Sequence, residues 1–303
     1  MRSKYGFRNY AAAFLLSFGA TGAFAGPVIL GGDDLTDHGS RSAGGVNLAG
    51  WKYIQLAIGN LLTNQTRAGA ITSDVAALGS TANPSFTAGD AGGAIGSAAN
   101  VLGKTVAYFD GATAINQFFA NLVAGTINPR VIWIAGNGAV NDVDSAEGAA
   151  ITANASVINS FVAAGGGIMS HGSGGDVYGW LGALLPGLSD SGSCSSSGAT
   201  LTAAGQAAFP SLTNSDVDSN AGPCHSSFVG NFGGLVPLVL DGQRLPYIIG
   251  GGANTLIQCG IQGQPACPPQ EGSVPVPQTL ALIGLGLASV LVTRRRRLSS
   301  VTT

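Results

Sequence analysis

The feature that most constrains the fold is an alternation of short apolar runs with longer helical segments in the middle of the chain. Residues 130–135 (RVIWIA) have the composition of a buried strand, and residues 146–164 carry apolar side chains at helical spacing. Three glycines at 165–167 end that helix, as glycines commonly do, and residues 168–170 (IMS) form the next short run. Alternation at this spacing predicts a parallel sheet, because parallel strands need helical crossovers.

The same alternation extends through most of residues 26–252. We expect further strands at 27–30, 70–78, 105–109, 235–240 and 246–249, and further helices at 48–62, 91–102, 112–123 and 201–209. These elements predict one α/β domain over residues 26–252, a three-layer fold whose mostly parallel sheet has helices on both faces. Residues 253–273, rich in Gly, Pro and Gln, are interpreted as a linker.

The N-terminal end, residues 1–25, has the three parts of a secretory signal. A basic start precedes a short apolar run at 11–16, and the segment ends Ala23-Phe24-Ala25. Small residues at Ala23 and Ala25 form an A-x-A cleavage site before Gly26. The segment therefore predicts export with cleavage, and an uncleaved membrane anchor is the alternative.

The C-terminal end combines a proline motif, an apolar helix and a basic cluster. The apolar stretch 280–292 is short, yet with its flanks it can form a transmembrane helix, and the positive-inside rule keeps the arginines and residues 298–303 cytoplasmic. The residues that define this tail are Val274, Pro275, Val276, Pro277, Arg294, Arg295, Arg296 and Arg297.

Over residues 274–297 this tail resembles that of PEP-CTERM exported proteins, with Val276 where the family usually has Glu. The resemblance implies processing by an exosortase-type enzyme after transient residence in the inner membrane of a Gram-negative bacterium. It also implies a destination at the cell-envelope surface or outside the cell, with exopolysaccharide as a possible partner.

Charge is segregated along the chain. Seven of the 13 basic residues lie in the two ends, whereas all 15 acidic residues lie between Asp33 and Glu271. Residues 26–272 keep six basic residues and so carry a net charge of −9. Such an acidic domain is not expected to bind nucleic acid, whose affinity depends on phosphate neutralisation.

The four cysteines all lie in the exported part, which favours two disulfides in an oxidising compartment. Three pairings are possible, and we favour Cys194–Cys224 with Cys259–Cys267, because each pair closes a loop within one irregular region. A zinc site is the alternative, although the chain has no C-x-x-C spacing and the nearest histidine is His225.

The strand–helix–strand order over residues 127–188 is similar to the class I glutamine amidotransferase-like and flavodoxin-like folds. In amidotransferases a nucleophilic cysteine lies on the turn after the strand. Here the turn reads Ser170-His171-Gly172-Ser173-Gly174, without a cysteine, so a thiol mechanism is not supported.

The same turn offers a candidate nucleophile, Ser173, at the sheet edge where open α/β sheets bind ligands. Its base would be His171 or His225, oriented by Asp216 or Asp218, which gives a secreted serine hydrolase. The G-x-S-x-G elbow is absent because position 171 is His. The alternative is a structural turn with a hydrogen-bonded His171.

A second candidate site is the acidic cluster after the first strand. Asp33, Asp34 and Asp37, next to His38, provide hard oxygen ligands that suit Ca²⁺, although the spacing is not that of an EF-hand. No cofactor is otherwise predicted. We therefore expect an exported surface protein with a non-catalytic domain, the alternatives being a serine hydrolase and a Ca²⁺-dependent binding module.

Overall fold

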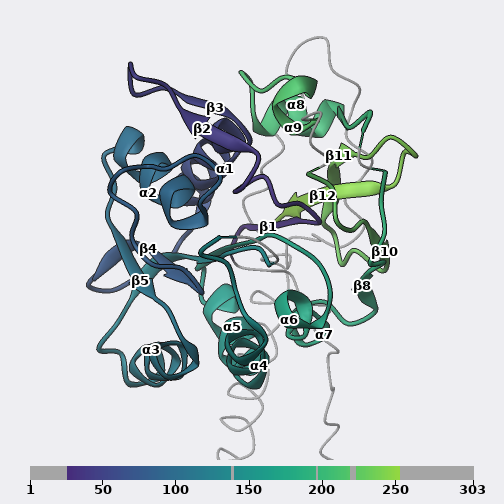
Figure 1. The fold of residues 1–303 in the computed structure, drawn as a ribbon. Coiled ribbons are helices and arrows are strands. Elements are labelled where there is room, and N and C mark those ends of the chain that lie inside the picture. Colours follow the sequence, from purple (N-terminus) through teal and green to yellow (C-terminus); the bar gives the residue numbers. More distant parts are fainter. Residues whose placement is uncertain (1–25, 138–139, 196, 219–222, 253–303) are drawn as a thin grey trace, which may run out of the picture. The chain divides into compact units, whose positions relative to one another are not determined.

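An eight-stranded sheet organises the fold. The computed structural model describes residues 26–137, 140–195, 197–218 and 223–252. The strand order is β5-β4-β6-β7-β1-β12-β11-β9 (Figure 1). The strands are β1 (Val28–Gly31), β4 (Ser73–Leu78), β5 (Val106–Phe109), β6 (Pro129–Ile134), β7 (Gly167–Ser170), β9 (Thr200–Leu201), β11 (Val236–Leu240) and β12 (Pro246–Gly251).

Five neighbouring strands, from β5 to β1, run parallel, which confirms the predicted mostly parallel sheet. Their long crossovers are helical. In Figure 1, α1 and α2 lie on one face of the sheet and α3, α4 and α5 on the other. The helices are α1 (Gly50–Asn64), α2 (Ala91–Leu102), α3 (Ala112–Ala124), α4 (Ser145–Ala153) and α5 (Ala155–Ala163).

The other edge of the sheet is antiparallel. β12 pairs antiparallel with β1, β11 with β12, and β9 with β11. Several short elements were not predicted, because they are too brief to show a periodicity. They are β2 (Gly39–Arg41), β3 (Asn47–Ala49), β8 (Leu188–Asp190), β10 (Phe228–Gly230), α6 (Gly175–Tyr178), α7 (Leu181–Leu184) and α9 (Asn214–Val217).

Three predicted helices have different bounds in the structure. The helix expected at 146–164 is broken at Asn154, whose side chain donates to the Ala150 carbonyl (2.9 Å), so it forms α4 and α5. The helix expected from residue 48 begins at Gly50, because Leu48 belongs to strand β3. The helix expected at 201–209 is the shorter α8 (Ala203–Ala208).

The core lies on both faces of the sheet, and Trp51, Trp133 and Trp180 are fully buried in it. Among the described residues, no helix has the length and apolar character needed to cross a membrane. The predicted transmembrane segment at 280–292 lies outside those residues, as do the signal at 1–25 and the tail.

Candidate functional site

The carboxyl ends of the parallel strands gather most of the predicted site residues. Connections leave β4 toward β5 and β6 toward β7, in opposite directions along the sheet (Figure 1). Such a reversal opens a crevice where ligands of α/β sheets bind. Asn141, in the loop after β6, is hydrogen-bonded to the loop after β4. It accepts from the Thr81 N–H (2.7 Å) and donates to the Asp90 carboxylate (3.1 Å).

His171, at the end of β7, is a buried part of the interior. Its side chain is fully buried, with Nδ1 2.7 Å from Asp33 Oδ1 and Nε2 3.0 Å from the Trp133 indole nitrogen. An indole N–H can only donate, so Nε2 accepts and a neutral ring carries its proton on Nδ1, donated to Asp33. Both ring nitrogens are therefore engaged, which leaves neither available to activate a serine.

Ser173 follows on the same turn but is held through its backbone. Its N–H donates to Asn137 Oδ1 at 2.9 Å, and Gly172 has a positive φ of 93°. A side chain on Gly172 would lie 2.3 Å from the same Asn137 oxygen, so only glycine fits there. Within the part of the chain that the structure describes, no hydrogen bond joins Ser173 to His171 or His225.

His225 is bound to a different carboxylate from the one expected. Its Nε2 lies 2.9 Å from Asp34 Oδ2, and the ring is about one third exposed. The hydrogen bond that His225 donates to the Asp34 carboxylate raises the pKa of His225 above its ordinary value. Asp216, one proposed orienting acid, instead pairs with Lys52 at 2.8 Å, and Asp218 accepts from the Gly198 N–H at 2.8 Å. The residues of the proposed triad thus lie in separate interactions.

The three aspartates proposed as Ca²⁺ ligands differ in their partners. Asp33 is fully buried and bound to His171, and Asp34 contacts both His225 and His38, the latter at 3.3 Å. Asp37 has two buried carboxylate oxygens that find no hydrogen-bond partner among the described residues. Among the described residues, no three His, Cys, Asp or Glu side chains are placed to hold a metal ion together.

The electrostatic surroundings of Asp37 are unusual. Burial, then the negative charges of Asp142 and Asp34, raise the pKa of Asp37 to about 8, against the opposing effect of His225. The Asp37 carboxyl therefore carries a proton near neutral pH and can donate a hydrogen bond. A polar group kept in this state is a common mark of a ligand site, though structural networks also produce it.

Two residues at this edge of the sheet, Thr36 and Asp142, were not predicted from the sequence as part of a site. The Thr36 hydroxyl is fully buried and has no hydrogen-bond partner within the described part of the chain. It lies 3.7 Å from the place where a Cβ on Gly136 would be, and Asp142 Oδ2 lies 3.6 Å from that place. Thr36 and Asp142 thus face one small space over a glycine, on loops far apart in the sequence, so no local motif could have connected them.

A disulfide closes the loop beside this edge. Cys194 and Cys224 are bonded, with a Cα–Cα distance of 6.0 Å, which confirms that predicted pair. Cys224 forms an isolated bridge with Asp33, so the bond fixes the segment that carries His225 beside the end of β1. Cys259 and Cys267 lie outside the described residues.

Comparison with known proteins gives one match. Residues 273–297 match the model of the PEP-CTERM protein-sorting motif, a span that contains the proline motif and the arginine cluster. No curated protein and no solved structure shows a significant match to the chain. The motif implies export, sorting to the cell envelope and processing by an exosortase-type system. The chain therefore carries a PEP-CTERM protein-sorting motif at residues 273–297.

Proposed function

We propose that the mature protein is a cell-surface or extracellular protein whose α/β domain binds a ligand and does not catalyse a reaction, with exopolysaccharide as its partner. The sorting motif at 273–297 is the observation that carries the proposal. The basic clusters at both ends act as addressing signals, and the acidic domain between them is the delivered part.

The proposed route has three steps. The secretion machinery removes residues 1–25, using Ala23 and Ala25 as the cleavage signal. Residues 280–292 then hold the chain in the inner membrane, with the four arginines on the cytoplasmic side. The exosortase-type enzyme cuts near Pro277 and releases the domain from the membrane or re-anchors it.

The non-catalytic part of the proposal is supported by the geometry of His171. Both of its ring nitrogens are engaged in the interior, by Asp33 and Trp133, and the protein holds Ser173 through its backbone N–H. We therefore expect the parent protein and a Ser173→Ala variant to hydrolyse no member of an ester and glycoside panel. Hydrolysis by the parent that the variant loses would revive the serine hydrolase.

Intact-mass analysis of the protein from envelope and medium tests the route. The expected mature species lacks residues 1–25 and the tail beyond about Pro277. Replacement of the four arginines by glutamine removes the basic cluster and should leave the precursor uncut. Replacement of Lys52 by glutamine, a basic residue within the domain, is the matched control and should be processed normally. A mature protein that keeps Arg294–Arg297 indicates a plain anchor and contradicts the proposal.

The Ca²⁺-dependent binding module is kept as a second candidate because of Asp37. Its two unpartnered oxygens and its acidic neighbours form an arrangement that a cation can stabilise by displacing the proton. Calorimetry with Ca²⁺ on the full chain should give heat that an Asp37→Asn variant loses. Absence of heat in the parent rejects this candidate without affecting the sorting route.

A further inference from the structure

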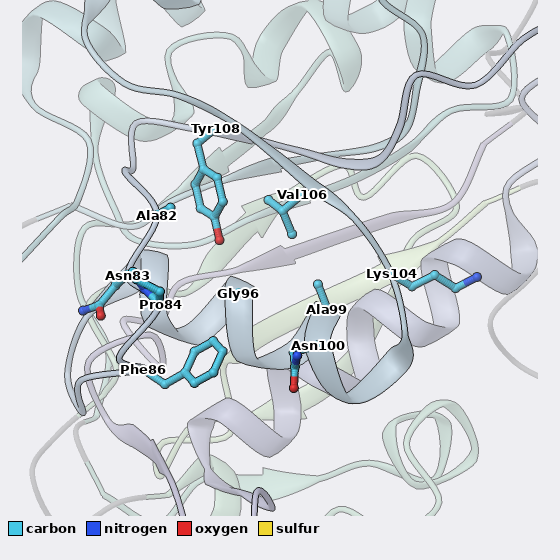
Figure 2. Close-up of a pocket in the computed structure, with 10 residues that line it drawn as sticks. All are labelled: Ala82, Asn83, Pro84, Phe86, Gly96, Ala99, Asn100, Lys104, Val106 and Tyr108. Carbon is cyan, nitrogen blue, oxygen red and sulfur yellow. The ribbon is translucent and has the colours of Figure 1, made fainter.

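A second candidate site is a pocket beside the edge strand β5. Its volume is about 270 Å³, and it lies between the loop after β4, helix α2 and strand β5 (Figure 2). The lining is part aromatic, part aliphatic and part polar. The residues on which the argument depends are Asn83, Phe86, Gly96, Asn100, Lys104 and Tyr108.

Two aromatic side chains flank a glycine in this pocket. Figure 2 shows Phe86 and Tyr108 reaching from opposite sides toward the space in front of Gly96. A Cβ on Gly96 would lie 2.8 Å from the Tyr108 hydroxyl and 3.5 Å from the Phe86 ring. Phe86 also has a left-handed backbone, with φ of 48°, which is rare for a bulky residue and often marks a functional position. The absent side chain at Gly96 therefore keeps the middle of the pocket open.

The polar groups of the pocket present mainly donors. Asn100 Oδ1 accepts from Arg41 Nη2 (2.9 Å), and Asn83 Oδ1 accepts from the Ser85 N–H (3.1 Å). Both partners can only donate, which fixes the orientation of each amide and leaves its NH₂ group without a hydrogen-bond acceptor among the described residues. The Tyr108 hydroxyl makes only a long contact of 3.4 Å with a carbonyl. Burial and the charge of Asp90 raise the pKa of Tyr108 to about 12, so the phenol keeps its proton.

Positive charge gathers at the pocket although the domain is acidic. Of the six basic residues between 26 and 272, Lys104 lines the pocket and Arg41 lies 4.5 Å from the centre of the Phe86 ring. Within the described segments neither forms an ion pair with a carboxylate, whereas Lys52 and Arg130 do. The pocket thus combines aromatic surface, amide N–H donors and a phenol, beside two cations that form no ion pair with a carboxylate among the described residues.

We propose that this pocket binds one carboxylated sugar ring of an acidic polysaccharide. A pyranose ring presents an apolar C–H face that can lie against Phe86 or Tyr108. Its hydroxyl oxygens accept hydrogen bonds from the asparagine amides, and its carboxylate is complementary to Lys104, a flexible point charge on a long stem. This inference names the saccharide class of the exopolysaccharide partner, and it rests on the proposed function for the identity of that partner as a polysaccharide.

Calorimetry on the full chain with defined glycans tests the inference. The probes are a uronic-acid trisaccharide, the corresponding neutral trisaccharide, the free uronic acid, and polyacrylate, which has carboxylates but no rings. We expect the acidic trisaccharide to bind at least about tenfold more tightly than the neutral one, the value of one charge-assisted hydrogen bond. Because the pocket accepts one ring, the free uronic acid should also bind at least about tenfold more tightly than a neutral monosaccharide, which serves as a fifth probe. Equal binding of the neutral trisaccharide, or equal binding of polyacrylate, overturns the inference.

Two variants locate the binding in the pocket. Gly96→Ala fills the space between the rings and should abolish measurable binding, while alanine favours the helix. Gly59→Ala, in helix α1, is the matched control, since its Cβ would meet only ordinary contacts at 3.5 Å, and it should bind as the parent does. Lys104→Gln, at an exposed position, should lower affinity for the acidic trisaccharide about tenfold and leave neutral sugars unchanged.

Parent-like binding of the acidic trisaccharide by both pocket variants refutes the site. If polysaccharide prepared from the producing cells retains the protein while no uronic-acid probe binds, the pocket inference fails and the proposed function stands. If the probes bind but the protein is never processed at its tail, the sorting route fails and the pocket stands.

Discussion

Replacement of Asp37 by Asn should stabilise the domain in a pH-dependent way. Folding raises the pKa of Asp37 from 3.8 to about 8, so between these values the native state holds a proton that the unfolded chain releases. Stability therefore falls as pH rises through this window, and the deficit is complete above the folded pKa. Each unit corresponds to about 1.4 kcal/mol, but Asp37 as a residue is only half-buried although its two carboxylate oxygens are covered, so solvent screening reduces the effect to about 2 kcal/mol.

Urea unfolding followed by circular dichroism, in EDTA and at fixed ionic strength, measures the effect. Near pH 3 the parent carboxyl is protonated in both states, so Asp37→Asn should match the parent. Near pH 8 the variant should be more stable by about 2 kcal/mol, because Asn resembles the neutral acid without the ionisation. Asp110→Asn, which removes an exposed carboxylate, should change stability by less than about 0.5 kcal/mol at either pH. An Asp37→Asn variant whose advantage does not grow with pH refutes the reasoning.

Three further perturbations test the surroundings of this edge. His171→Ala breaks two buried hydrogen bonds and leaves the buried Asp33 carboxylate with the Leu35 N–H as its remaining donor among the described residues, so it should cost about 3–5 kcal/mol in urea unfolding; a loss below about 1 kcal/mol would show that the network is not formed. Removing the disulfide with a Cys194→Ala/Cys224→Ala double variant frees a loop with a sequence separation of 30 and should cost about 2–4 kcal/mol, measured by thermal unfolding against the oxidised parent, whereas the reduced parent should match the variant. The pKa of His225 is raised by Asp34, so this pair should stabilise the fold at acidic pH and lose its effect as pH rises through the folded pKa. NMR titration of His225 should show the raised pKa in the parent and its decrease in Asp34→Asn; an unchanged pKa contradicts the pairing.

The parallel half of the sheet was predictable because its signals are local. Residues 130–135 are a continuous apolar run, and the structure places a buried strand there because both faces of β6 are covered. The helix over 146–164 was predicted as one element, since its apolar spacing continues across Asn154. The break depends on hydrogen bonds of that side chain to Asn116 and Ala150, which the spacing alone does not reveal.

The candidate site was only partly predictable because its chemistry depends on long-range contacts. The turn carrying His171 was expected at the carboxyl edge of the sheet, because it directly follows a predicted parallel strand, and the structure places it at the end of β7. The partners of His171 were not expected, because Trp133 reads as an ordinary core residue in a strand. The unusual state of Asp37 likewise depends on Asp142, which reaches it from the loop after β6.

Removal of the two ends changes the electrostatics of the protein from a net charge of −2 to −9 over residues 26–272. An acidic glycan is therefore repelled by the mature domain as a whole, and only a local arrangement can bind it. At physiological salt the screening length is about 8 Å, so repulsion from distant carboxylates is largely screened, whereas direct contacts at Lys104 are not. Moderate salt should consequently weaken the repulsion from the acidic domain more than the direct contacts in the pocket, so that the acidic glycan binds. Binding that weakened steeply as salt fell would show that the domain's repulsion dominates, and binding that persists would show that the pocket contacts do.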